Sequence, residues 1–388
     1  MVSESSGLPQ LTTVLLLPLQ GTAAAFDNED RDKCVMPGQP TPAQLGFRMP
    51  AEWEPHTATW LAWPHNRETW PGRFAGIPAV WAKLAELLSA CEPVHILAGG
   101  RTVMDEARRM IGHRPGVHLD NIPTNDAWIR DFGPTFLSRD QSGETAIVDW
   151  TYDAWGGKYP PYDDDRRATE RINADLCLRR FAPGVVFEGG AIEVNGRGSV
   201  LAGEACLLHA GRNPGLGRSD IERLLADYLA APHVIWLGRG IAGDDTDGHV
   251  DQLARFVGER TVVVSVEEDP EDENFAPLCD NLARLRLARD QDGRRLEIVR
   301  LPLPRAIYNG ADRLPATYAN FYIANGVVVV PTFDDPADRP ALETLASCFP
   351  ARKICPLPAN DLIAGLGAVH CITQQQPRPA TMNKSRPC

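Results

Sequence analysis

Stretches with helical spacing alternate along this chain with stretches typical of buried strands, and this alternation limits the folds that the chain can adopt. Residues 78–90 place their apolar side chains on one helical face, and a short apolar run typical of a strand follows at 94–98. The next helix is predicted at 102–111, where Gly112 ends it. The pattern therefore predicts an α/β protein.

The same alternation continues toward the C-terminus. Further strands are predicted at 146–150, 185–187, 200–209, 234–237, 252–266, 296–303 and 353–357. Further helices are predicted after a capping box at Ser219 and Glu222, at 274–290 and at 340–348. Residues 316–331 are predicted to form a hairpin that turns at Asn325-Gly326.

No Gly/Ser linker separates these units, so we expect one continuous domain at residues 46–377. Periodicity alone leaves open whether the units form an open sheet or close into a ring. Residues 1–45 are rich in Pro, Thr and Ala without periodicity, and we expect a poorly ordered N-terminal extension there. Residues 378–388 are expected to form a C-terminal tail.

Charge and cysteine usage restrict the partners of the protein. The 388 residues carry a formal net charge of −12, which argues against nucleic acid and favours a small cationic substrate. The 9 cysteines show no C-x-x-C pair and no Cys/His cluster at zinc spacing, as expected for a reduced intracellular protein.

The N-terminal apolar run is too short to span a membrane. It covers residues 14–19, contains Pro18, and has no Lys or Arg before it, so it is a poor signal peptide. We therefore expect a soluble, cytoplasmic protein with no membrane partner.

Four short segments carry candidate chemistry, and the first is 125–134. It contains Asp126, Trp128, Arg130 and Asp131 and ends in Gly-Pro, which indicates a loop. Carboxylates can bind a planar guanidinium through paired hydrogen bonds, and an indole can cover a cation. On this segment alone, a surface turn whose acids pair with Arg130 is the favoured explanation.

The second segment places Glu188 before two glycines at the end of an apolar strand. Sites in α/β proteins collect at such strand exits, although Gly-Gly is also common turn chemistry.

The third segment, 243–251, is the richest in acids. Asp244, Asp245, Asp247 and Asp251 surround His249, the side chain best suited to move protons near neutral pH. A metal site built on these residues stays open, but the spacing fits neither an EF-hand nor H-E-x-x-H.

The fourth segment holds Cys371, which follows two glycines and His370. By itself this cysteine could be a buried structural residue. Together with His249 and the acids, it could instead be the nucleophile of a site that binds a cation.

The chain resembles the agmatine deiminases, members of the guanidine-modifying superfamily that includes the bacterial peptidylarginine deiminases. The resemblance runs from Phe47 to Pro377 and is carried by the segments 49–63, 125–134, 155–162, 188–190, 211–216, 243–251, 319–322 and 370–375. It implies a pentein-type five-bladed propeller of ββαβ units, with pseudo-fivefold symmetry around a central active site.

The resemblance also implies roles for single residues. Cys371 would be the nucleophile and His249 the general acid/base, with Glu188 orienting His249. Asp131 and Asp251 would clamp the guanidinium. The residues that would contact the rest of the substrate are Asp245, Trp128, Asp126 and Arg130. Leu366 stands where relatives usually have glycine.

The implied reaction is hydrolysis of agmatine to N-carbamoylputrescine and ammonia through a covalent thiouronium, without a metal or organic cofactor. Peptidylarginine or free arginine is the alternative substrate. A non-catalytic guanidine- or polyamine-binding protein and a metal-dependent hydrolase built on His249 and Asp251 are the alternatives from other classes. A homodimer or a higher homo-oligomer is left open.

Overall fold

The computed structural model describes residues 39–379, all within one compact unit, Pro37–Cys388. Most of the predicted N-terminal extension and of the predicted tail therefore lies outside the described residues. Within the described range, the backbone N–H of Ala43 donates to Asp227 O, and Leu45 packs against buried apolar residues. No helix in this range is long and apolar enough to cross a bilayer.

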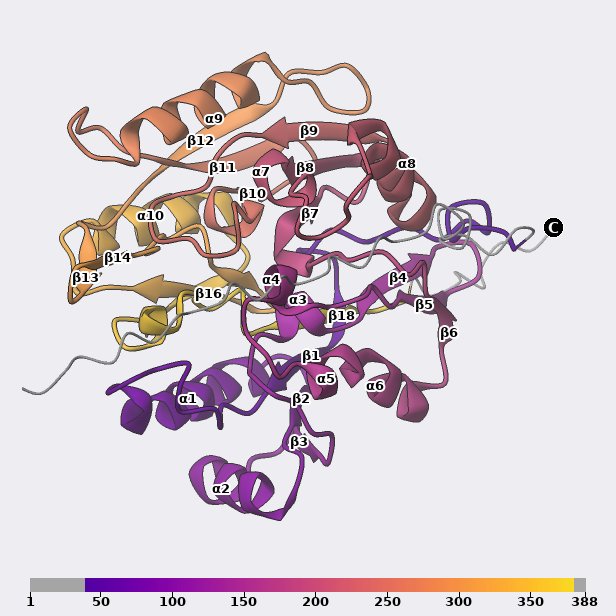
Figure 1. Ribbon diagram of the computed structural model, residues 1–388, viewed down its shortest axis with the longest axis vertical. Coiled ribbons are helices and arrows are strands. Elements are labelled where there is room, and N and C mark those ends of the chain that lie inside the picture. Colours follow the sequence, from indigo (N-terminus) through magenta and orange to yellow (C-terminus); the bar gives the residue numbers. More distant parts are fainter. Residues whose placement is uncertain (1–38, 380–388) are drawn as a thin grey trace, which may run out of the picture. The chain divides into compact units, whose positions relative to one another are not determined.

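Sheets and helices alternate along the described chain, which confirms the mixed α/β prediction (Figure 1). Five sheets share one strand pattern, in which an antiparallel pair is followed by a parallel neighbour. Four of them are β4 (Thr135–Arg139), β5 (Glu144–Val148) and β6 (Arg179–Phe181); β7 (Ile192–Val194), β8 (Ser199–Gly203) and β9 (His233–Leu237); β10 (Ala254–Phe256), β11 (Thr261–Val266) and β12 (Glu297–Pro302); and β15 (Tyr322–Ile323), β16 (Val327–Thr332) and β17 (Lys353–Pro358).

The remaining sheet of this kind joins the two ends of the described chain. Its strands are β18 (Gln374–Pro377), β1 (His56–Ala62), β2 (Val94–Leu97) and β3 (Val117–Asp120), in that order. β18 runs antiparallel to β1, with Gln374 opposite Trp60. The hairpin β13 (Ile307–Asn309) and β14 (Asp312–Leu314) stands apart, and no sheet in the described residues closes on itself.

A helix connects the parallel strands in each of the five sheets, as a parallel pair requires. These helices are α1 (Ile77–Ser89), α6 (Ala168–Leu176), α8 (Arg218–Leu229), α9 (Phe275–Leu287) and α10 (Asp338–Cys348). Several helices also touch the neighbouring sheet: α9 contacts β9 and β11, α10 contacts β12 and β17, and α1 contacts β17 and β2. The helices therefore pack neighbouring sheets against one another.

The strongest periodic patterns are confirmed. α1 buries Ile77, Trp81 and Leu84, and α2 (Arg101–Ile111) ends at Gly112, whose φ is positive. The hairpin at Asn325-Gly326 is also confirmed, since β15 and β16 flank it.

Four details of the prediction are wrong. The strand predicted at 185–187 is absent, since Val186 makes only an isolated bridge with Thr151. The cap of α8 is Gly217, whose N–H donates to Asp220, so the predicted box at Ser219 is two residues late. The strand predicted at 252–266 is the antiparallel pair β10 and β11, and the strand predicted at 200–209 ends at Gly203, where α7 (Glu204–Leu207) begins. In the strands predicted at 252–266 and 200–209 an apolar run hides a turn, because apolar spacing reports burial and not chain reversal.

The tryptophan-rich region 53–70 packs into the largest apolar core. Trp63, Trp70 and Trp81 are fully buried. Trp70 lies 5.4 Å from Trp128, measured between ring centroids, and its Nε1 donates to Leu362 O. This contact ties the segment before α3 (Ile129–Phe132) to the segment that precedes Cys371.

Candidate active site

Three of the predicted site residues meet at Gly190, in the short 3₁₀ turn after Glu188. A Cβ atom at this glycine would lie 2.5 Å from His249 Nδ1, 2.9 Å from Asp131 Oδ1 and 3.1 Å from Asp251 Oδ2. Glycine is therefore the residue that lets these three side chains approach the same point. Asp131 lies in α3, His249 directly precedes the 3₁₀ turn Val250–Gln252, and Asp251 lies within that turn.

The Asp131 carboxylate is buried and held through both oxygens. Oδ1 accepts the backbone N–H of Gly190 at 2.9 Å, and Oδ2 accepts Trp155 Nε1 at 3.0 Å. Burial raises the pKa of Asp131 above its ordinary value, although the His249 imidazole acts in the opposite direction.

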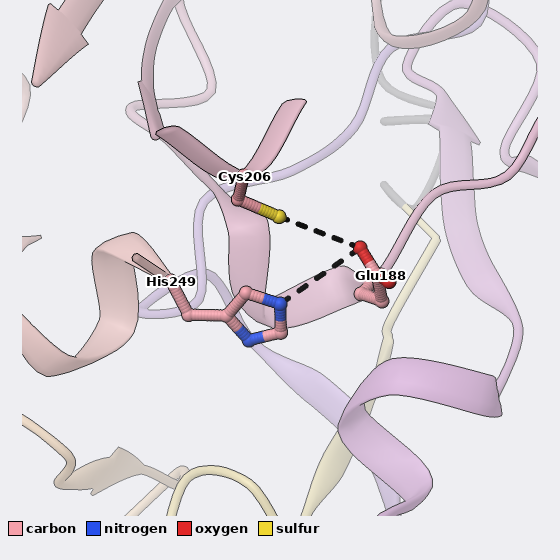
Figure 2. Close-up of side chains that lie close together, drawn as sticks. All are labelled: Glu188, Cys206 and His249. Atoms are coloured by element: carbon pink, nitrogen blue, oxygen red, sulfur yellow. Dashed lines mark hydrogen bonds and ion pairs between the residues drawn. The ribbon is translucent and has the colours of Figure 1, made fainter. Parts of the chain in front are cut away.

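His249 lies between Asp131 and Glu188. Its Nδ1 is 3.7 Å from Asp131 Oδ1, and its Nε2 is 3.9 Å from Glu188 Oε2 (Figure 2). Both distances are too long for hydrogen bonds, and neither ring nitrogen has a hydrogen-bond partner among the described residues. Burial alone would lower the pKa of His249, but Asp131, Cys206 and Glu188 raise it well above its ordinary value.

Glu188 is fixed by an arginine on its other side. Arg212 Nε donates to Glu188 Oε1 at 2.9 Å, and both side chains are buried. Burial alone would raise the pKa of Glu188, but His249 and Arg212 hold it below its ordinary value. Glu188 is thus a carboxylate with one oxygen committed to Arg212 and the other directed at His249.

Cys371 lies beside Asp251. Its Sγ is 3.6 Å from Asp251 Oδ2 and accepts a hydrogen bond from Asn320 Nδ2 at 3.2 Å. His370 Nδ1 binds the same Asp251 oxygen at 2.7 Å, while Oδ1 is buried without a hydrogen-bond partner in the described part of the chain. One oxygen of Asp251 is therefore held in place, and the other is available to a ligand.

The charge around Cys371 disfavours its thiolate as long as no cation is present. Burial raises the pKa of the Cys371 thiol well above its ordinary value, and Asp251 and Asp131 add to this shift. A cation placed between these carboxylates would remove the repulsion. The arrangement thus couples thiol ionisation to the arrival of a positive charge.

A cavity of about 1090 Å³ reaches this cluster. Its lining includes Trp128, Asp131, Trp155, Asp245 and Cys371. A site with an apolar indole wall and convergent carboxylates is typical of a pocket for an elongated organic cation.

The segment before Cys371 packs tightly on Trp128. A Cβ atom at Gly367 would lie 2.5 Å from Trp128 Cζ3, so this glycine allows the close contact. Leu366 lines the cavity and adopts a left-handed conformation with a φ of 70°. Leu366 thus adopts a backbone conformation that favours glycine.

Asp245 and Asp126 also line the cavity. Tyr159 OH donates to the Asp245 carboxylate, and Lys158 Nζ donates to Asp245 O at 2.6 Å. Asp126 accepts Thr69 Oγ1 at 2.6 Å, and burial raises its pKa above the ordinary value.

Arg130 lies elsewhere. It is not among the residues that line the cavity. Its Nη1 donates to Gln375 Oε1 at 2.7 Å, and its Nη2 is 3.4 Å from Glu52 Oε2. The structure therefore brings together the other eight predicted site residues along the cavity and its buried cluster and leaves Arg130 outside.

The sequence reasoning assigned no role to several residues of the cluster. The segments that carry the family resemblance include Trp155, Arg212 and Asn320, so the resemblance was the signal that could have identified these residues. Glu52 also falls within such a segment, 49–63. Cys206 had no such signal, because its contact with Glu188 joins different segments of the chain.

In both sequence and structure, the chain is similar to proteins of the deiminase class. It belongs to the Porphyromonas-type peptidyl-arginine deiminase family, whose model matches residues 48–377. The resemblance predicted from the sequence is thereby confirmed.

The most similar relatives described here are agmatine deiminases. That of Pseudomonas putida strain F1 is 38% identical over 364 residues, covering 87% of this chain and 98% of the relative. That of Stutzerimonas stutzeri is 37% identical over 362 residues, with the same coverage of 87% and 98%. Among solved structures, the agmatine deiminase of Enterococcus faecalis superposes with a TM-score of 0.84 at 34% identity and covers 88% of this chain and 98% of that one. A C. jejuni agmatine deiminase with substrate bound gives a TM-score of 0.78 at 28% identity, covering 86% and 97%.

Proposed function

We propose that this protein hydrolyses agmatine to N-carbamoylputrescine and ammonia with Cys371 as the nucleophile. The observation that carries the proposal is the convergence of an imidazole and two carboxylates on one buried point beside a cavity, with the Cys371 thiol 3.6 Å from one of these carboxylates. The similarity to agmatine deiminases over most of the chain supports agmatine as the substrate.

Asp131 and Asp251 bind the guanidinium group. A planar guanidinium presents paired N–H donors, which match carboxylate oxygens. The unpartnered Oδ1 of Asp251 and the burial of both acids support this role, since each buried carboxylate gains a matching cation when substrate arrives.

Substrate binding also activates the nucleophile. Because Asp251 and Asp131 raise the pKa of the Cys371 thiol, neutralising them with the guanidinium lowers that pKa again. The thiolate then attacks the guanidinium carbon and forms a tetrahedral adduct.

His249 moves the protons. It protonates one nitrogen of the adduct, and ammonia leaves, so that an S-alkylthiouronium remains on Cys371. His249 then takes a proton from water, which attacks the thiouronium carbon and releases the carbamoyl product and the thiolate. Glu188, itself held by Arg212, orients the imidazole.

Trp128, Asp126 and Asp245 contact the remainder of the substrate. Agmatine carries an ammonium group at the end opposite its guanidinium, and acidic groups along the cavity suit a second positive charge. A free arginine would bring its carboxylate to the same region, where Asp245 would repel it. For Arg130 we propose a structural role, supported by its contacts with Glu52 and Gln375.

For the fold we propose a five-bladed ring around this site, formed by residues 46–377. The repeated strand pattern, the helices that pack neighbouring sheets together, and the pairing of β18 with β1 support closure. The homo-oligomer and the cytoplasmic location stay predictions.

The test is ammonia release from agmatine, free arginine and an arginine-containing peptide, measured in parallel. We expect agmatine to have the highest kcat/KM. Comparable or faster turnover of arginine or the peptide would assign a different substrate, and no ammonia from any of the three would contradict a deiminase.

A further inference from the structure

Cys206 is a second buried thiol beside the catalytic imidazole, and the proposed reaction does not use it. It lies in α7, directly after β8, and is fully buried. Its Sγ donates to Glu188 Oε2 at 3.6 Å. Figure 2 shows the Cys206 sulfur and a His249 ring nitrogen directed at the same Glu188 oxygen.

The three side chains offer a sulfur, a nitrogen and an oxygen at metal-ligand spacing. One donor atom from each lies within 4.8 Å of the other two. Tetrahedral zinc with its usual bond lengths needs about 3.3–3.6 Å between donor atoms. The sulfur–oxygen distance of 3.6 Å meets this requirement, and the nitrogen–oxygen distance of 3.9 Å must shorten by only a few tenths of an ångström.

His249 gives a second, independent indication of a ligand. Its side chain is completely buried, yet neither of its ring nitrogens has a hydrogen-bond partner among the described residues. Buried polar groups are almost always satisfied, so an unpartnered imidazole directed at a carboxylate and a thiol is unusual.

The charges nearby also suit a divalent cation. Arg212 occupies Glu188 Oε1 and leaves Oε2 to face the thiol and the imidazole. Asp131, which lines the cavity, lies 3.7 Å from His249 and adds a carboxylate near the cluster. Sulfur and nitrogen donors select zinc-like ions over magnesium and calcium, which take oxygen ligands.

We propose that Glu188, Cys206 and His249 bind one soft divalent transition-metal ion such as Zn²⁺, and that the bound ion inhibits the enzyme. The thiol and the protonated imidazole each lose a proton to solvent when the ion takes their lone pairs. The inhibitory effect rests on the proposed function, because it follows from removing His249 from proton transfer. Binding of the metal ion does not depend on the proposed function.

Binding is tested with Co²⁺ as a spectroscopic probe in the full-length Cys371→Ser protein, which lacks the cavity thiol. We expect a thiolate-to-cobalt absorption band that saturates at one Co²⁺ per chain and is displaced by Zn²⁺. The band should disappear with Cys206→Ala added and persist with Cys355→Ala, a matched removal of another buried thiol. Absence of the band, or its survival without Cys206, would overturn the proposal.

A second measurement covers the case in which Cys206→Ala fails to fold. In the Cys371→Ser protein, Zn²⁺ should slow the alkylation of Cys206 by iodoacetamide and should leave the alkylation rate of Cys355 unchanged. Both rates are measured by peptide mass spectrometry. An unchanged labelling rate of Cys206 at saturating Zn²⁺ would also overturn the proposal.

The inhibitory effect is measured separately as ammonia release from agmatine. Relative to each protein's own uninhibited rate, Cys206→Ala should raise the Zn²⁺ concentration for half inhibition at least about tenfold, while Cys355→Ala should not. If the metal binds but no agmatine turnover is detected in the wild-type protein, the proposed function fails and the metal site stands.

Discussion

Gly190 determines how closely the imidazole and the clamp carboxylates approach one another. His249 Nδ1 and Asp131 Oδ1 both lie within 3 Å of the position that a Cβ would take there. The site is therefore sensitive to a single added methyl group at a residue that touches no reacting atom in the proposed mechanism.

We expect Gly190→Ala to fold but to lose at least about 100-fold in kcat/KM for agmatine, because displacement of catalytic groups by about 1 Å has that effect. Gly258→Ala is the matched control, since a Cβ there meets only Thr261 at 3.5 Å or more. Steady-state kinetics and circular dichroism of both variants test this. Wild-type kinetics in Gly190→Ala would contradict the described packing.

Trp155 supports the clamp through its indole N–H. This residue adopts a left-handed conformation with a φ of 58° and donates to Asp131 Oδ2 at 3.0 Å. We expect Trp155→Phe to lower kcat/KM about tenfold, because a hydrogen bond to a charged group is lost.

Trp150→Phe is the control for this variant. It also removes an indole hydrogen bond, but one that Trp150 Nε1 donates to Thr135 Oγ1 at 3.0 Å and not to Asp131. Equal losses of kcat/KM in the two variants would show that the Asp131 contact has no special role.

The sequence alone points to the residues whose chemistry is visible locally. Cys371 and His249 stand out because acids and glycines surround them in the chain. The roles of Arg212 and Cys206 depend on contacts with Glu188 across 24 and 18 residues, which no local pattern encodes.

At the scale of elements, β18 joins the end of the site loop to the first strand. It consists of three glutamines and a proline and is stabilised by side-chain amides. Gln374 Nε2 donates to Pro134 O at 2.6 Å, and Gln376 Oε1 accepts Trp60 Nε1 at 2.9 Å. Such a strand lacks the apolar alternation on which strand prediction depends, so the polar run was not recognised as a strand.

A chain that ends at Thr373 should be less stable than one that ends at Pro379, which keeps β18. We expect its free energy of unfolding to fall by at least about 3 kcal/mol, since several hydrogen bonds of about 1 kcal/mol each are lost. Urea unfolding of the two chains tests this. Coincident unfolding curves would show that the strand contributes nothing to stability.

At the scale of the whole described unit, Glu52 connects segments from several sheets. Its carboxylate lies 2.9 Å from Arg255 Nη2 in β10 and 2.8 Å from His370 Nε2, and it accepts the N–H of Ile323 in β15 at 2.8 Å. Burial alone would raise the pKa of Glu52, but Arg255 and His370 lower it well below its ordinary value.

A carboxylate whose pKa is lower in the folded state stabilises the fold above its unfolded pKa, near 4.3, and this contribution is lost as the pH falls. We therefore expect Glu52→Gln to lower the free energy of unfolding by about 3 kcal/mol at pH 7, as when one partner of a buried pair is removed. The difference from wild type should shrink as the pH drops below about 5.

Denaturant unfolding at a series of pH values measures this difference, with the exposed Glu343→Gln as control. A Glu52→Gln difference that is independent of pH would contradict the buried ion pairs.

The family resemblance covered the chain from Phe47 to Pro377, nearly the range 48–377 of the family match. Periodicity alone could not decide how the sheets are arranged. That arrangement depends on contacts such as those of α9 and α10 with neighbouring sheets and on the pairing of the two chain ends. Such contacts form only in the folded unit, and no pattern in the neighbouring sequence predicts them.

The most direct test of the account is ammonia release from agmatine by Cys371→Ser, compared with wild type and with Cys355→Ser. Without the thiolate no thiouronium can form, so we predict a correctly folded Cys371→Ser protein that releases no ammonia, while Cys355→Ser remains active. Wild-type turnover by Cys371→Ser would contradict the account.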